Sequence, residues 1–117
     1  MKVTRFEDLI AWQKAQDLAV IIYETYAQNK DWGFKDQIQR ASVSVSNNVS
    51  EGFDRGTDPD FIRFLNFART SCNEVKSMTY LAFRLKYITD EIKQKVILLC
   101  EEISRIIWGL IRSLTKK

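Results

Sequence analysis

Apolar side chains recur at the spacing of an α-helix along four long segments of this chain, and no other feature constrains the fold more. In one segment, Ile38, Ala41, Val45 and Val49 fall on a single stripe when residues are placed about 100° apart. One proline and four glycines in 117 residues leave little material for the turns of an all-β fold. The chain is therefore predicted to be all-α.

Three short connecting segments separate the apolar stripes and mark the expected helix ends. Long helices with short links pack as an antiparallel up-down-up-down four-helix bundle. The length allows one buried core, so residues 1–117 are expected to form a single domain. The predicted helices span about residues 6–28, 35–53, 59–85 and 90–114.

Several residues carry signals for helix ends. Thr4 and Glu7 have the spacing of a capping box, and Thr89 precedes two acidic residues that suit a first helical turn. Asp58, followed by a proline, is predicted to cap the third helix. Gly33 is predicted to give the first connection a positive φ.

The segment from Gln37 to Phe53 is a poor helix former, because Ser, Asn and Val each cost up to about 0.7 kcal/mol relative to Ala. Ser42, Ser46 and Ser50 form a strip of small side chains that permits the close approach of another helix. Neighbouring helices are therefore expected to hold this segment in place.

The chain contains no histidine, which removes the usual general base and the commonest zinc ligand. Gly52 and Gly56 lack the spacing of a phosphate-binding loop. Cys72 and Cys100 lie in apolar helical patterns without a CxxC motif, so we expect two buried free thiols. These features favour a protein that is not an enzyme and needs no cofactor or metal.

No apolar run reaches the ~20 residues of a membrane span, and no signal peptide is recognisable. We therefore expect a cytoplasmic protein without a membrane partner. Ile10, Leu98 and Trp108 lie off the main apolar stripes. They are either scattered surface residues or part of a self-association surface.

The net charge of +3 is modest, so the distribution of cations matters more than their total. Spaced cations suit phosphate binding, because each neutralised phosphate releases counterions. The alternative is a solvated helix face, and cations at a helix C-terminus also complement its dipole. The candidate nucleic-acid-binding residues form three groups: Arg69 with Lys76, Arg105 with Arg112, and Arg40 with Arg55 and Arg63.

Several pieces of sequence carry a family resemblance: FEDLIAWQKA at 6–15, QIQRA at 37–41, VSNNVSEGF at 45–53, FIRFL at 61–65, and the shorter matches Ala68-Arg69, Ser71 and Glu74-Val75. With them the chain resembles the small four-helix-bundle proteins encoded by intervening sequences of bacterial 23S ribosomal RNA genes. This family is similar to the accessory variability determinant of diversity-generating retroelements. The chain departs from the family pattern at Ser46, Thr70 and Lys76.

The resemblance implies a homopentamer of four-helix bundles with a role associated with RNA or DNA, and it does not imply an enzyme. The alternative is a protein-interaction or scaffold module that docks a nucleic-acid-handling protein such as a reverse transcriptase. Asn48, Glu51 and Gly52 belong to the matched motif and are expected to be structural. Glu51 is expected to meet a second subunit, and Arg40 a phosphate.

Overall fold

The computed structural model describes residues 2–116 and contains only helices and their connections within that range. A short 3-10 turn, η1, precedes four α-helices, which confirms the predicted all-α class. The elements are η1 (Phe6–Asp8), α1 (Ile10–Thr25), α2 (Trp32–Asp54), α3 (Asp58–Arg84) and α4 (Asp90–Thr115).

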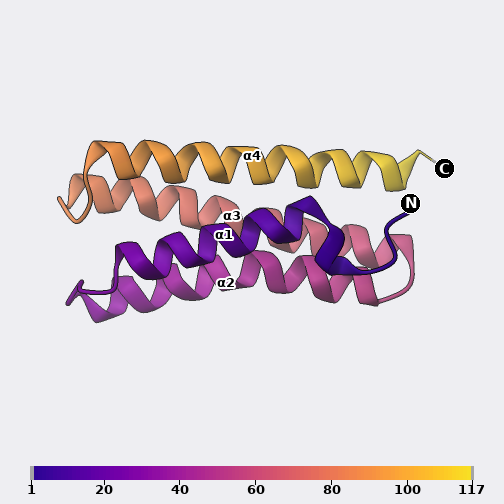
Figure 1. Ribbon diagram of the computed structural model, residues 1–117, viewed down its shortest axis with the longest axis horizontal. Coiled ribbons are helices and arrows are strands. Elements are labelled where there is room, and N and C mark those ends of the chain that lie inside the picture. The colour runs from indigo at the N-terminus through magenta and orange to yellow at the C-terminus, as the bar shows by residue number, and fades with distance from the viewer. Residues whose placement is uncertain (1, 117) are drawn as a thin grey trace.

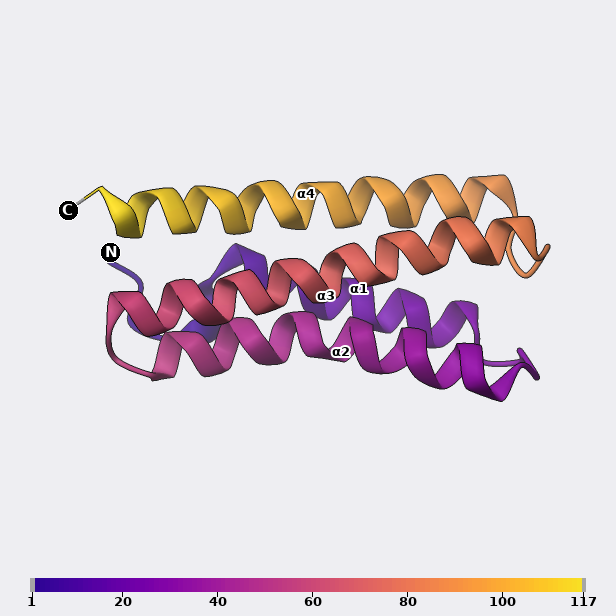
Figure 2. The same cartoon turned by 180° about the vertical axis from the view of Figure 1, so that it is seen from behind.

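The helices run alternately up and down, so that both chain ends lie at the same end of an elongated bundle (Figure 1). The bundle measures 46 × 21 × 20 Å. Each helix packs against its neighbours in sequence, and α1 also contacts α4, which closes the bundle. The contact between α2 and α3 is the most extensive among the helix pairs and that between α1 and α4 the least extensive. The view from behind shows α2 and α3 running side by side along the bundle (Figure 2). The predicted up-down-up-down topology is confirmed.

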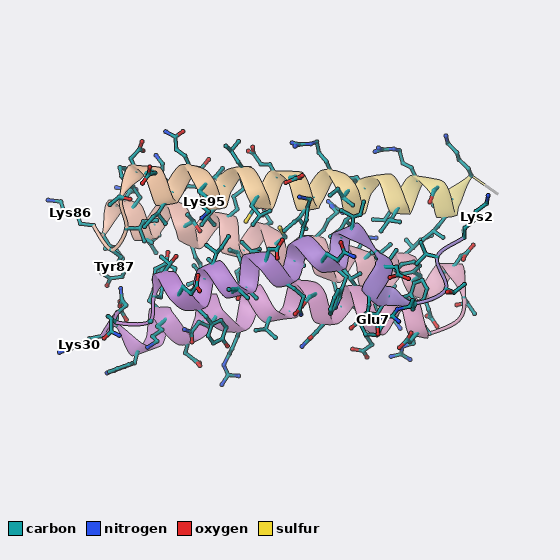
Figure 3. The ribbon with its side chains drawn as sticks, in the orientation of Figure 1. Lys2, Glu7, Lys30, Lys86, Tyr87 and Lys95 are labelled. Carbon is teal, nitrogen blue, oxygen red and sulfur yellow. The ribbon has the colours of Figure 1, made fainter. Side chains whose placement is uncertain are left out.

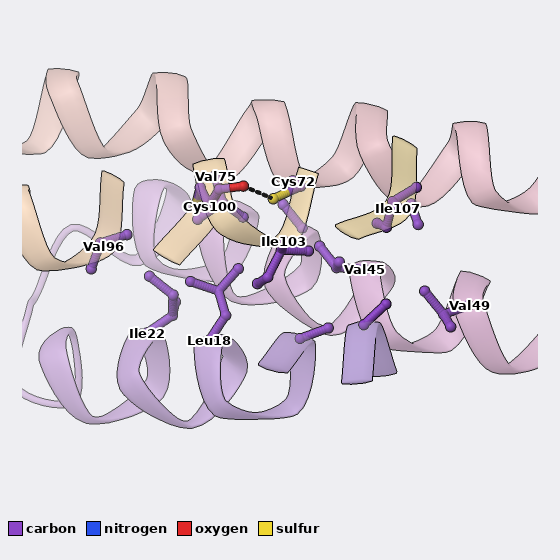
Figure 4. Packing of buried hydrophobic residues seen from close by; sticks show 14 of the residues in the cluster. Leu18, Ile22, Val45, Val49, Cys72, Val75, Val96, Cys100, Ile103 and Ile107 are labelled. Carbon is purple, nitrogen blue, oxygen red and sulfur yellow. Dashed lines mark hydrogen bonds between the residues drawn. The ribbon is translucent and has the colours of Figure 1, made fainter. Parts of the chain in front are cut away.

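The predicted apolar stripes form the core (Figure 4). The stripe of α2 is fully inside: Ile38, Val45 and Val49 have no exposed surface, and Ala41 is 5% exposed. Side chains from all four helices meet it along the bundle axis. Those labelled in the close view are Leu18, Ile22, Val45, Val49, Cys72, Val75, Val96, Cys100, Ile103 and Ile107.

Serine hydroxyls join α2 to both of its neighbours, as its weak helix propensity requires. Gln16 Nε2 of α1 donates a hydrogen bond to Ser46 Oγ at 3.0 Å. Ser71 Oγ of α3 donates to Ser44 Oγ at 2.9 Å. Ser42 is completely buried and donates to the carbonyl of Gln39. Small polar side chains thus allow close packing without leaving a buried group unpaired.

The first helix differs from the prediction. Leu9 has extended backbone (φ −75°, ψ 126°) and separates η1 from α1, which ends at Thr25. Neither N-terminus is capped by a side chain, so the Thr4–Glu7 capping box is wrong. Leu9 is buried, and the break in the helix lets it enter the core while η1 folds across the bundle. Tertiary burial has overridden the local signal.

Two other helix ends also differ. Gly33 lies inside the first turn of α2, because Asp31 caps that helix by accepting a hydrogen bond from the Phe34 N–H. In the same way Thr57, and not Asp58, caps α3. At α3 the prediction chose the wrong one of two neighbouring capping residues, and at α2 it placed the start about three residues too late without naming a cap. The predicted cap of α4 by Thr89 is confirmed, and the bounds of α3 and α4 agree with the prediction within one residue.

A hydrogen bond ties together the two connections at one end of the bundle. Tyr87 Oη, after α3, donates to Asp31 Oδ2 at 2.6 Å. Figure 3 shows Tyr87 at the same end as Lys30, the residue before Asp31. The hydrogen bonds from Tyr87 and from the Phe34 N–H hold the pKa of Asp31 below its usual value. Asp31 therefore serves as helix cap and as a link between connections.

The lowered pKa predicts an acid-sensitive contribution to stability. A carboxylate with a depressed folded pKa stabilises the fold above its unfolded pKa of about 4, and this contribution is lost as the pH falls through the folded value. Asp31→Asn keeps a capping oxygen but cannot ionise. We expect wild type to lose stability relative to D31N below about pH 4, measured by urea unfolding across pH. Parallel curves for the two proteins would contradict this.

Glycines 52 and 109 make a matched pair for testing how closely the helices pack. A Cβ on Gly52 would lie 2.5 Å from Phe64 Cβ and 3.2 Å from a ring carbon of Phe61, whereas one on Gly109 meets nothing within 4 Å. We expect Gly52→Ala to destabilise the fold by about 1–3 kcal/mol through overpacking. Gly109→Ala should stabilise it by about 0.5–1 kcal/mol through helix propensity. Thermal unfolding measures both, and equal effects would exclude this packing.

Candidate nucleic-acid interface

The seven candidate cations lie in separate places on the bundle. Arg69 and Lys76 of α3 face Arg105 of α4 across the seam between these helices, and Arg112 continues along α4. We call this surface the α3–α4 face. The remaining candidates, Arg40, Arg55 and Arg63, lie on α2 and around the α2–α3 connection.

A groove of about 260 Å³ opens between α3 and α4. Short side chains at Asn73 and Ser104 leave this space, with larger side chains at both ends. Polar, charged and aromatic groups therefore line one concave surface, the arrangement from which ligand sites are built. The lining residues are Cys72, Asn73, Lys76, Cys100, Glu101, Ser104, Arg105 and Trp108.

Trp108 is stacked against Arg69 across the seam. The guanidinium carbon of Arg69 lies 4.0 Å from the centre of the indole ring, and Nη1 donates to Asn66 Oδ1 at 2.7 Å. Trp108 remains 42% exposed, so part of the ring is open to a ligand. In the sequence, Trp108 lies off the apolar stripe, and no candidate site includes it. Its position three residues after Arg105, on a neighbouring part of the same helix face, was the available signal.

The cations of the α3–α4 face differ in whether an acid of the protein neutralises them. Lys76 Nζ lies 3.1 Å from Glu101, and this interaction raises the pKa of Lys76 above its ordinary value, so the ammonium stays charged. Within residues 2–116, Arg105 and Arg112 form no salt bridge, and both are exposed. Arg112 also lies in the last turn of α4, where it complements the helix dipole.

The floor of the groove carries the two cysteines. Both are buried free thiols, as predicted, and Cys72 Sγ donates to the carbonyl oxygen of Cys100 at 3.4 Å (Figure 4). The interaction of its side chain with that of Cys72, together with burial, raises the pKa of the Cys100 thiol. Cys100 therefore contributes a neutral, weakly polar surface.

The other three candidate cations are each paired with an acid one helical turn away. Arg40 Nε lies 2.8 Å from Asp36, which leaves little unbalanced charge on the outer face of α2. This acid is four residues before the arginine on the same helix, a spacing that favours a pair. Phosphate binding by Arg40 stays a prediction.

Arg55 and Arg63 flank the ring of Phe64, with guanidinium carbons 4.7 and 4.8 Å from its centre. Each also pairs with an acid at 3.5 Å, Glu51 and Asp60 respectively. This arrangement covers a buried aromatic ring and joins α2 to α3. These cation–π contacts stabilise the packing of α2 against α3.

The family-motif residues have local partners. Asn48 Nδ2 donates to the carbonyl oxygen and to Oγ of Ser44, within α2, and Gly52 packs directly on Phe64. Glu51 pairs with Arg55 inside the subunit. An intersubunit partner for Glu51 stays a prediction.

The part of the chain that the structure describes contains no cluster of three His, Cys, Asp or Glu side chains able to hold a metal ion. None of its helices is long and apolar enough to cross a membrane.

Comparison with known proteins decides the family. The sequence model of a family described as 23S rRNA-intervening sequence protein matches residues 7–109, most of the chain. The chain belongs to this family. A member of the S23 ribosomal protein family from Bacteroides thetaiotaomicron, a protein with unknown function, has a similar crystal structure. The identity is 27% and the TM-score 0.82, over 88% of this chain and 99% of that chain.

No curated protein matches the chain significantly. The match to the 23S rRNA-intervening sequence protein family includes Arg69, Lys76, Arg105 and Trp108, and it ends before Arg112. Family membership therefore supports the fold but assigns no activity. A function for this bundle rests on the residues of its own surface.

Proposed function

We propose that this 23S rRNA-intervening sequence protein is a non-enzymatic bundle that binds nucleic acid through its α3–α4 face. The observation that carries the proposal is the position of Arg105 in a groove beside the exposed Trp108, with no salt bridge to any residue between 2 and 116. Cations that are not neutralised by the protein itself contribute most to phosphate binding, since they have no internal partner to lose. The two free thiols fit a reducing cytoplasm.

The charge along this face supports the proposal. Arg69, Lys76 and Arg105 lie at the seam, Arg112 follows on α4 seven residues after Arg105, and Glu101 is the acid of the groove. Arg69 interacts with the neutral residues Asn66 and Trp108, which leave its positive charge intact. A row of cations attracts a polyanion, and the attraction weakens as salt screens it.

A charge-removal experiment tests the site. We expect Arg105→Gln with Arg112→Gln to weaken binding of a labelled RNA and to lower the slope of log affinity against log salt by about 1 to 2. Fluorescence anisotropy between about 50 and 200 mM salt measures both quantities. Arg40→Gln is the comparison variant: Asp36 already balances this arginine on another face, so its loss should weaken binding less. Equal losses in both variants would place the binding elsewhere.

We also propose that the protein is an oligomer, with the homopentamer implied by its family resemblance as the preferred state. Large apolar side chains remain on the surface of the single subunit, and their burial would favour assembly. They include Ile10, Val20, Tyr80, Leu81 and Leu98. Assembly would also repeat the cations of each α3–α4 face around a ring, which strengthens the field that a phosphate backbone meets.

Light scattering at micromolar concentration tests the assembly. We expect a mass several times that of one 13.7 kDa chain, and five times that mass for the pentamer. The mass should persist at high salt, because burial of apolar surface is not screened. A mass of one chain in both conditions would rule out the oligomer.

A second candidate function, docking of a nucleic-acid-handling protein, has one favouring observation. Near the α3–α4 connection, Tyr80 and Leu98 flank a depression of about 250 Å³ that also contains Ile97. Exposed aromatic and aliphatic groups around a hollow are typical of protein contacts. A partner held there remains bound after nuclease treatment, whereas one held through nucleic acid is released.

A further inference from the structure

We propose that the α3–α4 face binds single-stranded rather than double-stranded nucleic acid, with one base stacked on the indole of Trp108. This inference rests on the proposed function and specifies its ligand. Bases in a duplex are already stacked on each other, whereas those of a single strand are free to stack on aromatic side chains. An exposed indole in a basic groove is therefore selective for unpaired bases.

The size of the groove fits one base. Its volume of about 260 Å³ lies just below the ~300–1,000 Å³ of typical small-molecule pockets, so it holds a compact group. The cysteine floor is buried and weakly polar, which suits the apolar body of a base. Asn73 and Ser104 supply an amide and a hydroxyl for hydrogen bonds to a base edge or to a ribose hydroxyl.

The surrounding cations are placed for the backbone of the same strand. Lys76 and Arg105 lie with Trp108 along the groove lining, and Arg69 lies against the indole. Asn66 holds the Arg69 side chain by a 2.7 Å hydrogen bond, which fixes the position of the guanidinium beside the ring. A base on Trp108 thus has positive charge close to it on both α3 and α4. Stacking platforms combined with a positive groove are the general pattern of single-strand binding.

Trp32 provides an internal comparison. It is 67% exposed, has Lys35 Nζ 5.0 Å from its ring centre, and lines a depression with Lys35, Asp36 and Gln39. An indole ring again lies beside a cation, here lysine in place of arginine, but this lining has one positive and one negative charge. Charge complementarity to a polyanion therefore favours the Trp108 groove over the Trp32 depression.

Anisotropy with a labelled RNA of about 12 unpaired nucleotides, within the footprint range of single-strand binders, tests the inference against a hairpin duplex of equal length. We expect wild type to prefer the single strand. Trp108→Ala should weaken single-strand binding by about 5- to 150-fold, the effect of one stacked base, with little change for the duplex. Trp108→Phe should retain much of the affinity, and Trp32→Ala should behave as wild type.

The outcomes separate this inference from the function on which it rests. Equal binding of both RNAs by wild type, with W108F and W108A unchanged, would overturn single-strand stacking and leave nucleic-acid binding intact. Absence of any binding by wild type at low salt would overturn both. If W108A fails to fold by circular dichroism, Trp108→Leu replaces it, because leucine keeps an apolar side chain but removes the stacking ring. The preference of wild type for the single strand is measured without any variant.

Discussion

Close packing between α2 and α3 is the constraint on which the rest of the bundle depends. Gly52 lies so near Phe64 that a side chain carbon would overlap it, and Ser71 reaches Ser44 directly across the seam. Gln37 extends the seam by donating to Glu74 at 3.1 Å. These contacts span much of α2 and hold a segment with poor intrinsic helix propensity. Helix α2 is therefore stabilised mainly by its packing against neighbouring helices.

The α3–α4 seam is less extensively packed, and this difference creates the candidate site. Where α2 meets α3, small residues bring the two backbones together. Where α3 meets α4, Cys72 and Cys100 pack inside while Asn73 and Ser104 are too short to close the outer part of the seam. Trp108 and its partner Arg69 stand beside the resulting groove. The α2–α3 seam thus stabilises the bundle, whereas the α3–α4 seam contains a groove large enough for a small group.

Most of the fold follows from the sequence, because the helical periodicity of the core is strong. The stripe from Ile38 to Val49 is buried as predicted, and the cap at Thr89 is confirmed. The predicted helix ends are wrong where two neighbouring residues can both cap a helix, or where burial of a side chain in the core sets the backbone conformation. Leu9 interrupts the first helix and enters the core. This effect depends on distant parts of the chain, so the residues next to Thr4 do not predict it.

The candidate site was predictable only in part. The pairing of Arg40 with Asp36 follows from spacing along one helix, so the balanced charge of these residues was within reach of the sequence. The contact of Arg69 with Trp108 joins residues of two helices and depends on their register. Register is fixed by packing of the whole bundle, which periodicity alone does not give.

The central claim, that nucleic acid binds at the α3–α4 face, can be tested on the full-length chain with 5-fluorotryptophan and fluorine NMR. The chain has three tryptophans, Trp12, Trp32 and Trp108, and hence three reporters at different places on the bundle. Titration with single-stranded RNA should shift the Trp108 resonance and leave those of Trp12 and Trp32 nearly unchanged. A shift confined to Trp32, or no shift of Trp108 at saturating RNA, would contradict the account.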